Sequence, residues 1–219
     1  MATKKTSITR DKIVSLYMTY RLENTTKPKS VYLFAKENGF DEAVFYSFFG
    51  TLESVEKEIY KIFIEKAVEM IQKDPAYDNY NMKSKMLSFY FTFFELLSAN
   101  RSYVLLSLNE NKNQLKNLML LSGLRTEFKN YVSDIITDEV RTQYEKFQNF
   151  QEKAIMESSW LQFLLILKFW LDDDSPSFEK TDLFIEKSVK AVFDVFNIIP
   201  LESVLDLGKF LYKEKTQKN

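Results

Sequence analysis

Hydrophobic residues recur along this chain at helical spacing, and alternating strand-like patterns are almost absent. The first such stretch follows the i, i+3, i+4, i+7 spacing of one helix face, with Ile13, Leu16, Tyr17 and Tyr20. Thr9 is a suitable N-cap for this helix. Asn24 tolerates the left-handed conformation that often ends a helix, so the pattern predicts a helix between the two.

Two short helices and a longer one follow. Ser30 is placed to cap a helix that runs to Asn38 and stops at Gly39, and Asp41 to cap one that stops at Gly50. A helix is then predicted from about residue 51 to 74. Its apolar stripe consists of Val55, Ile59, Ile62, Phe63, Ala67, Met70 and Ile71.

The remaining pattern is also helical. Residues 74–81 break the long helix, and an aromatic helix follows near 86–97. Further helices are predicted near 101–121, 123–149, 150–171, 178–197 and from Pro200 onward. Ser175 followed by Pro176 is a favourable start for the helix at 178–197. The prediction is an all-α protein of nine or ten helices.

Composition narrows the possible chemistry. Only 4 Gly and 4 Pro are present, aromatic residues make up 16%, and the chain has no Cys and no His. It therefore lacks thiolate chemistry, the commonest general base and the commonest metal ligand. We expect no enzyme activity, no metal and no cofactor.

The distribution of charge and hydrophobicity indicates which partners and which cellular location to expect. Residues 1–50 carry 8 basic and 5 acidic residues, whereas the chain as a whole has net charge -1. A modestly basic head on an acidic body suits a nucleic-acid module joined to another domain. The most apolar stretch, 160–171, is shorter than the ~20 residues of a membrane helix, and no signal-peptide pattern precedes it. We expect a soluble, cytoplasmic protein without a membrane partner.

Three short motifs carry a resemblance to a known family. They are FAKENGF at 34–40, VFYSFF at 44–49 and GTLESV at 50–55. Together with three short helices, a connecting helix and a larger helical body, they resemble the TetR family of bacterial transcriptional regulators. The resemblance implies a helix-turn-helix DNA-binding domain over 1–55 and a helical ligand-binding and dimerisation domain over 56–219.

The same resemblance implies a set of DNA-contacting residues. Tyr46 would contact a backbone phosphate, and Lys36 would lie near the backbone. Residues 41–44, 47 and 48 would face the groove or its rim. The complete set is Ser30, Tyr32, Lys36, Asp41, Glu42, Ala43, Val44, Tyr46 and Ser47. Six further basic residues could add affinity, namely Lys4, Lys5, Arg10, Lys12, Lys27 and Lys29.

Four positions depart from the family pattern. Val44 replaces a common hydroxyl residue, and Leu52 replaces a common Lys. Glu42 is acidic where basic or neutral residues are frequent, and Phe48 replaces a polar residue. Two hypotheses stay open. The first is a ligand-responsive regulator, most simply a repressor. The second is a TetR-like protein that has lost DNA binding and holds a hydrophobic small molecule or lipid.

The body supplies the other predicted sites. The resemblance implies a pocket for a hydrophobic effector, with candidate lining residues Phe89, Tyr90, Phe93, Tyr103, Phe128, Trp160 and Phe163. A plain aromatic core would use the same residues. Helices near 150–171 and 178–197 are candidates for a homodimer interface, because the first is apolar on nearly all sides towards its end. A symmetric dimer would read a pseudo-palindromic operator in double-stranded DNA.

Overall fold

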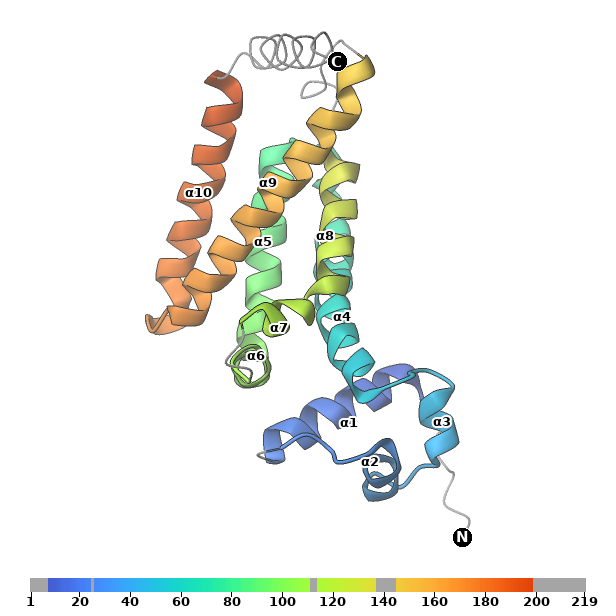
Figure 1. The fold of residues 1–219 in the computed structure, drawn as a ribbon. Helices are drawn as coiled ribbons and strands as arrows, with labels where there is room; N and C mark the ends of the chain where they lie inside the picture. Colours follow the sequence, from blue (N-terminus) through green and yellow to red (C-terminus); the bar gives the residue numbers. More distant parts are fainter. Residues whose placement is uncertain (1–7, 25, 111–113, 137–144, 199–219) are drawn as a thin grey trace, which may run out of the picture. The chain divides into compact units, whose positions relative to one another are not determined.

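The computed structural model describes residues 8–24, 26–110, 114–136 and 145–198, and every regular element within these ranges is a helix (Figure 1). The first helices are α1 (Arg10–Glu23), α2 (Val31–Glu37), α3 (Glu42–Tyr46), α4 (Leu52–Gln72) and α5 (Met82–Ala99). The others are α6 (Arg101–Leu108), α7 (Gln114–Met119), α8 (Ser122–Ile135), α9 (Glu145–Asp172) and α10 (Glu179–Ile198). Two single-turn 3₁₀ helices are η1 (Tyr77–Asn79) and η2 (Pro176–Phe178). The all-α prediction is confirmed.

The predicted helix starts near the N-terminus are also confirmed, because side chains accept the hydrogen bonds that cap them. The Thr9 hydroxyl accepts from the amide of Lys12 at 3.2 Å, and Ser30 accepts from Leu33 at 3.2 Å. The Asp41 carboxylate accepts from the amide of Ala43 at 2.8 Å. Each such cap contributes on the order of 1 kcal/mol to helix stability.

Several predicted helix ends need correction. Asn24 is extended, with φ -121° and ψ 143°, and closes α1 by donating its side-chain amide to the Tyr20 carbonyl at 2.9 Å. Gly39, with φ +73°, takes the left-handed conformation instead, in the turn between α2 and α3. Helix α3 ends at Tyr46 rather than at Gly50.

The middle and the end of the chain differ from the predicted pattern in detail. The stretch predicted as one helix near 101–121 forms two helices, α6 and α7. Met70, assigned to the buried stripe of α4, is 48% exposed because the helix turns this position outward. The helix predicted from Pro200 lies outside the described residues.

The three N-terminal helices share an aromatic core centred on Phe34, which is fully buried. Its ring lies edge-on to Tyr17 and Phe40, each at 5.8 Å between centroids, and to Phe45 at 6.3 Å. Edge-to-face pairs of this kind contribute about 0.5–1.5 kcal/mol each beyond the area they bury. The core therefore fixes α2 and α3 against α1. We call the part formed by α1–α3 the reading head.

The chain divides into two compact units, each built from two segments. The first combines Met1–Glu69 with Phe93–Glu127, and the second combines Met70–Thr92 with Phe128–Asn219. The reading head thus belongs to a unit that also contains α6, α7 and most of α4. The proposed domain boundary between residues 55 and 56 stays a prediction.

In the second unit α9 and α10 lie side by side and are joined by a short turn (Figure 1). Asp173 holds this turn together. Its carboxylate accepts hydrogen bonds from the amide and hydroxyl of Ser175 at 2.9 and 2.7 Å. It also accepts from the amide and hydroxyl of Thr181 at 2.9 and 2.6 Å. One buried carboxylate thereby satisfies four donors between the two helices.

Candidate functional site

The residues predicted to contact DNA lie outside the aromatic core of the reading head. Glu42 and Val44 are half-buried, and all other members of the set are exposed: Ser30, Tyr32, Lys36, Asp41, Ala43, Tyr46 and Ser47. The side chains of Phe45 and Phe49 on the same turn of chain are buried. The alternation follows from helical periodicity, since positions four apart share a face. We call the nine predicted residues the reading face.

Several side chains of the reading face are already engaged within it. Ser30 and Asp41 cap α2 and α3, and the Ser47 hydroxyl donates to the Val44 carbonyl at 2.7 Å. The Lys36 ammonium lies 6.0 Å from the centroid of the Tyr32 ring, at the outer limit of a cation–π contact. These contacts hold the local geometry but leave the face open to a partner.

Glu42 and Tyr46 form a pair one helical turn apart. The Tyr46 hydroxyl donates to a Glu42 carboxylate oxygen at 3.3 Å. Tyr46 is 54% exposed. The acidic residue that departs from the family pattern therefore holds the hydroxyl expected to reach a phosphate.

Two of the six basic residues considered as additional DNA contacts are held in ion pairs inside the first unit. Arg10 on α1 pairs with Glu58 on α4. Lys27, in the loop between α1 and α2, contacts two carboxylates, those of Glu56 and Glu110. Lys4 and Lys5 lie outside the described residues. At least two of the six basic side chains are therefore already engaged in ion pairs within the protein.

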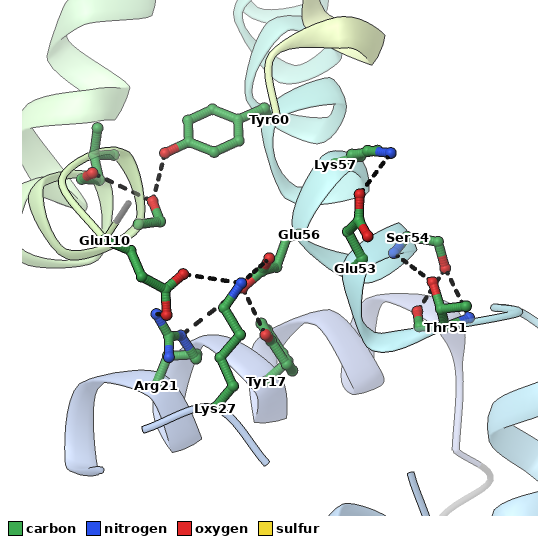
Figure 2. A network of polar contacts seen from close by, with 12 residues as sticks. Tyr17, Arg21, Lys27, Thr51, Glu53, Ser54, Glu56, Lys57, Tyr60 and Glu110 are labelled. Atoms are coloured by element: carbon green, nitrogen blue, oxygen red, sulfur yellow. Dashed lines mark hydrogen bonds and ion pairs between the residues drawn. The ribbon is translucent and has the colours of Figure 1, made fainter. Parts of the chain in front are cut away.

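The contacts of Lys27 belong to a larger ion cluster, which we define as Tyr17, Arg21, Lys27, Glu56 and Glu110 (Figure 2). The Tyr17 hydroxyl donates to one oxygen of Glu56 at 2.7 Å, and the Lys27 ammonium to the other at 2.7 Å. Glu110 accepts from a terminal nitrogen of Arg21 and from Lys27, both at 2.9 Å. The cluster thus joins residues up to 89 positions apart in sequence.

The centre of the ion cluster is buried. The side chains of Arg21 and Glu56 are each 1% exposed, with the Arg21 Nε 3.9 Å from a Glu56 oxygen. Removing one partner of a buried pair costs about 3–5 kcal/mol, since it leaves the other charge uncompensated. Burial alone would lower the pKa of Lys27, but its hydrogen bonds to Glu56 and Glu110 outweigh that effect and raise the pKa. Burial, reinforced by Glu56, raises the pKa of the Tyr17 phenol.

The sequence patterns did not predict this cluster, although a signal was present. Arg21 follows Tyr17 at the i+4 position, and so lies on the buried face of α1. Glu56 directly follows Val55 at the start of the apolar stripe of α4. A charged residue at a core position of a helix indicates a buried partner, but the pattern does not identify that partner.

Five of the candidate effector-binding residues come together in the second unit. They are Phe89 and Tyr90 on α5, Phe128 on α8, and Trp160 and Phe163 on α9. The ring centroids of Phe128 and Phe163 are 5.1 Å apart, and Trp160 stacks on Phe163 at 5.1 Å. Phe93 and Tyr103 are buried in the first unit.

The buried phenols of the second unit differ in their hydrogen bonding. The Tyr77 hydroxyl donates to that of Tyr131 at 3.0 Å, and Tyr131 donates to the Lys85 carbonyl at 2.9 Å. The Tyr90 hydroxyl is fully buried and has no hydrogen-bond partner among the described residues. Leaving a buried hydroxyl unpaired costs about 1–3 kcal/mol. Tyr90 therefore offers a polar group inside an otherwise aromatic cluster.

Three short N-terminal helices followed by longer helices place the described part of the chain in the all-α class. A comparison with protein families finds a match over residues 85–211, more than half of the chain, to the family described as "Tetracyclin repressor-like, C-terminal domain". The chain therefore belongs to the tetracyclin repressor-like, or TetR, family. A search among curated proteins returned no match.

Proposed function

We propose that this protein is a DNA-binding transcriptional regulator, most simply a repressor, whose affinity for its operator depends on a small hydrophobic effector. The main support for the proposal is that buried and exposed side chains of the reading head lie on different faces. Its apolar side chains form a closed core around Phe34, and its predicted contact residues face outward on α2 and α3. Membership of the TetR family, matched over residues 85–211, supports the same function from the other end of the chain.

We also propose that the protein acts as a two-fold homodimer through α9 and α10. An apolar stripe on α9 is exposed, with Leu161 at 59% and Leu165 at 55%, and Phe169 continues it one turn further on. On α10, Leu183 is exposed as well. A second copy of this surface would cover the stripe, and the four helices would form a bundle. Two reading heads related by two-fold symmetry would then read a pseudo-palindromic site.

This assignment also accounts for the hydropathy of α9. The stretch Glu152–Asp172 is long and apolar enough to cross a membrane by length and composition alone. Core helices pass the same test, and α9 buries Phe163, Ile166 and Trp170 within the protein. A dimer helix buried on two faces fits both observations. We therefore propose a cytoplasmic protein rather than a membrane protein.

The aromatic cluster of the second unit supports an effector site. Phe89, Tyr90 and Phe128 present rings from two helices, and the α9 rings pack against them. Sites for small apolar ligands contain mainly hydrophobic and aromatic side chains with a few polar groups. We propose that an effector bound there prefers one arrangement of the dimer and thereby changes DNA affinity. The protein performs no catalysis in this proposal.

The test is a selection of the purified full-length protein against random duplex DNA at low salt, read by sequencing. We expect enrichment of an inverted repeat, and loss of that enrichment in Ala43→Asp, which adds a negative charge at the exposed centre of α3. Ala76→Asp is the matched control, since Ala76 is exposed but lies outside the reading head. No enrichment by a folded wild-type protein would refute the regulator.

The Glu42–Tyr46 pair favours a second candidate. The Glu42 carboxylate accepts the hydrogen bond of the Tyr46 hydroxyl, which was expected to contact a phosphate. This pair, and the apolar residues Val44 and Leu52, fit a protein that keeps the TetR fold but has lost DNA binding. Such a protein would use its aromatic cluster to hold a hydrophobic small molecule or lipid. Native mass spectrometry that detects a bound apolar molecule, combined with no duplex binding at low salt, would favour this candidate.

A further inference from the structure

The ion cluster is divided between two groups of elements. All three donors, Tyr17, Arg21 and Lys27, come from α1 and the loop that follows it. The two acceptors come from elsewhere: Glu56 from α4, and Glu110 from the second position after the end of α6. Figure 2 shows the three donors converging on these two carboxylates. Every contact in the cluster therefore joins the reading head to α4 or to the residue two positions after α6.

Burial makes this junction difficult to open. Arg21 and Glu56 are almost completely withdrawn from solvent. Their charges are tolerated there only because each compensates the other and both are hydrogen-bonded to further members of the cluster. The reading head cannot move away from α4 and α6 without first exposing these charges or leaving them unpaired. While the cluster is intact, the head has one position within the first unit.

Glu110 is the member that connects the head to α6. It is the less buried carboxylate, 26% exposed, and it holds both Arg21 and Lys27. Without its charge, Tyr17 and Lys27 still bond Glu56. Helix α1 would then remain attached to α4, and only the connection to α6 would weaken.

We propose that Glu110 is a positioning residue for DNA recognition, which holds Arg21 and Lys27 and so sets the half-site spacing that the dimer accepts. The proposal rests on the proposed function, because it requires two reading heads on one DNA. Glu110 does not belong to the reading face and acts through the head. Half-sites on one face of B-DNA lie about 34–36 Å apart, so a small change in the position of each head changes which spacing fits.

The test measures DNA affinity for full-length wild type, Glu110→Gln and Glu58→Gln. The duplexes carry the selected half-site once, or as inverted repeats whose spacing changes in steps of one base pair. Glu58→Gln is the matched control, because Glu58 is also a carboxylate that ties α1 to α4, through Arg10, without contacting α6. It loses the same charge from the same unit.

We expect wild type and Glu58→Gln to favour one spacing. Glu110→Gln should lose about tenfold in affinity at that spacing, the size of a typical coupling between sites, and bind adjacent spacings almost equally. Its affinity for the single half-site should be unchanged. An unaltered spacing preference would overturn the inference. So would an equal loss on the single half-site, since that indicates damage to the head itself.

A measurement without DNA separates this inference from the proposed function. If wild type selects no DNA sequence, the proposed function as a DNA-binding regulator is wrong. Hydrogen exchange of the same three proteins then tests whether Glu110 holds α1 against α6. Glu110→Gln should raise exchange in α1 and α6, whereas Glu58→Gln should leave α6 unchanged. Equal exchange in α6 in both variants would overturn the inference. If Glu110→Gln does not fold, Glu110→Asp replaces it, since Asp keeps the charge but is one methylene shorter. Glu110→Asp should raise hydrogen exchange in α6 above the wild-type level. Exchange in α6 equal to that of wild type would overturn the inference.

Discussion

At the scale of single residues, Glu42 has the largest expected influence on the reading face. It adds a negative charge where DNA would approach, and its carboxylate accepts the hydroxyl of Tyr46. Replacing Glu42 with Gln keeps the size of the side chain and removes the charge. A unit charge about 4 Å from a phosphate in water is worth on the order of 1 kcal/mol, so DNA affinity should rise about fivefold.

The control for this prediction is Glu23→Gln, an exposed residue near the end of α1 that changes the net charge of the protein equally. Fluorescence anisotropy with the selected duplex measures both variants. An equal gain in affinity for the two would mean that net charge, rather than the local Glu42–Tyr46 pair, governs binding.

Tyr90 gives a second prediction at the residue scale. Its hydroxyl is buried without a hydrogen-bond partner among the described residues, so Tyr90→Phe should raise the free energy of unfolding by about 1 kcal/mol. The matched control is Tyr131→Phe, whose hydroxyl is bonded to Tyr77 and Lys85 and whose loss should destabilise by about 1–2 kcal/mol. Urea denaturation measures both. Destabilisation by Tyr90→Phe would show that this hydroxyl has a partner in solution.

At the scale of elements, the turn between α9 and α10 depends on the ionised form of Asp173. Burial of this carboxyl raises its pKa, but the hydrogen bonds from Thr181 and Ser175 outweigh burial and lower the pKa to about 2. Since the folded-state pKa is below the unfolded value of about 3.9, the contribution is complete above pH 4 and is lost as the pH falls towards 2.

The variant Asp173→Asn tests this contribution. It should lower the stability at pH 7 by about 1 kcal/mol or more and flatten the acid limb of the stability curve between pH 4 and pH 2. Thermal unfolding followed by circular dichroism across this range is the measurement, and Asp172→Asn is the control, since Asp172 is exposed and pairs with Lys168 on the surface. An unchanged acid limb in Asp173→Asn would contradict the assignment.

The element scale also shows how far sequence patterns reached. The caps at Thr9, Ser30 and Asp41 were predictable, because a capping side chain bonds the backbone two or three residues further on. The end of α1 was not, because both extended and left-handed conformations suit Asn24 and neighbouring packing selects between them. For α6 and α7, the polar residues 109–113 between them include no helix-breaking Gly or Pro, so the pattern suggested one helix.

At the scale of the whole molecule, the expected assembly is a homodimer. Replacing Leu161 and Leu165 together with Glu would place two charges in the proposed interface, so the double variant should be monomeric at micromolar concentration. Analytical ultracentrifugation of wild type and variant measures the mass. Leu22→Glu is the control, because Leu22 is similarly exposed, at 51%, but lies on α1. If wild type has the mass of a single chain at every concentration, the predicted homodimer is wrong.

Sequence patterns were sufficient to predict the all-α class, most of the helices and the caps at Thr9, Ser30 and Asp41. These depend on residues close in the chain, whose spacing fixes which side chains share a face. The sequence also carried enough of the local motif between residues 30 and 55 to indicate the TetR family, which the match over residues 85–211 then established.

Which residues far apart in the sequence come into contact depends on the packing of the helices. Nothing in the local pattern joins Arg21 to Glu110 across 89 positions. Nor does it show that Tyr131 is hydrogen-bonded whereas Tyr90 has no partner among the residues that the structure describes. Helical periodicity predicts which side chains face the interior. It does not predict the hydrogen-bond partner of a buried charge or hydroxyl, because that partner lies on another helix. The packing of α1, α4 and α6 therefore determined the ion cluster, and with it the position of the reading head within its unit.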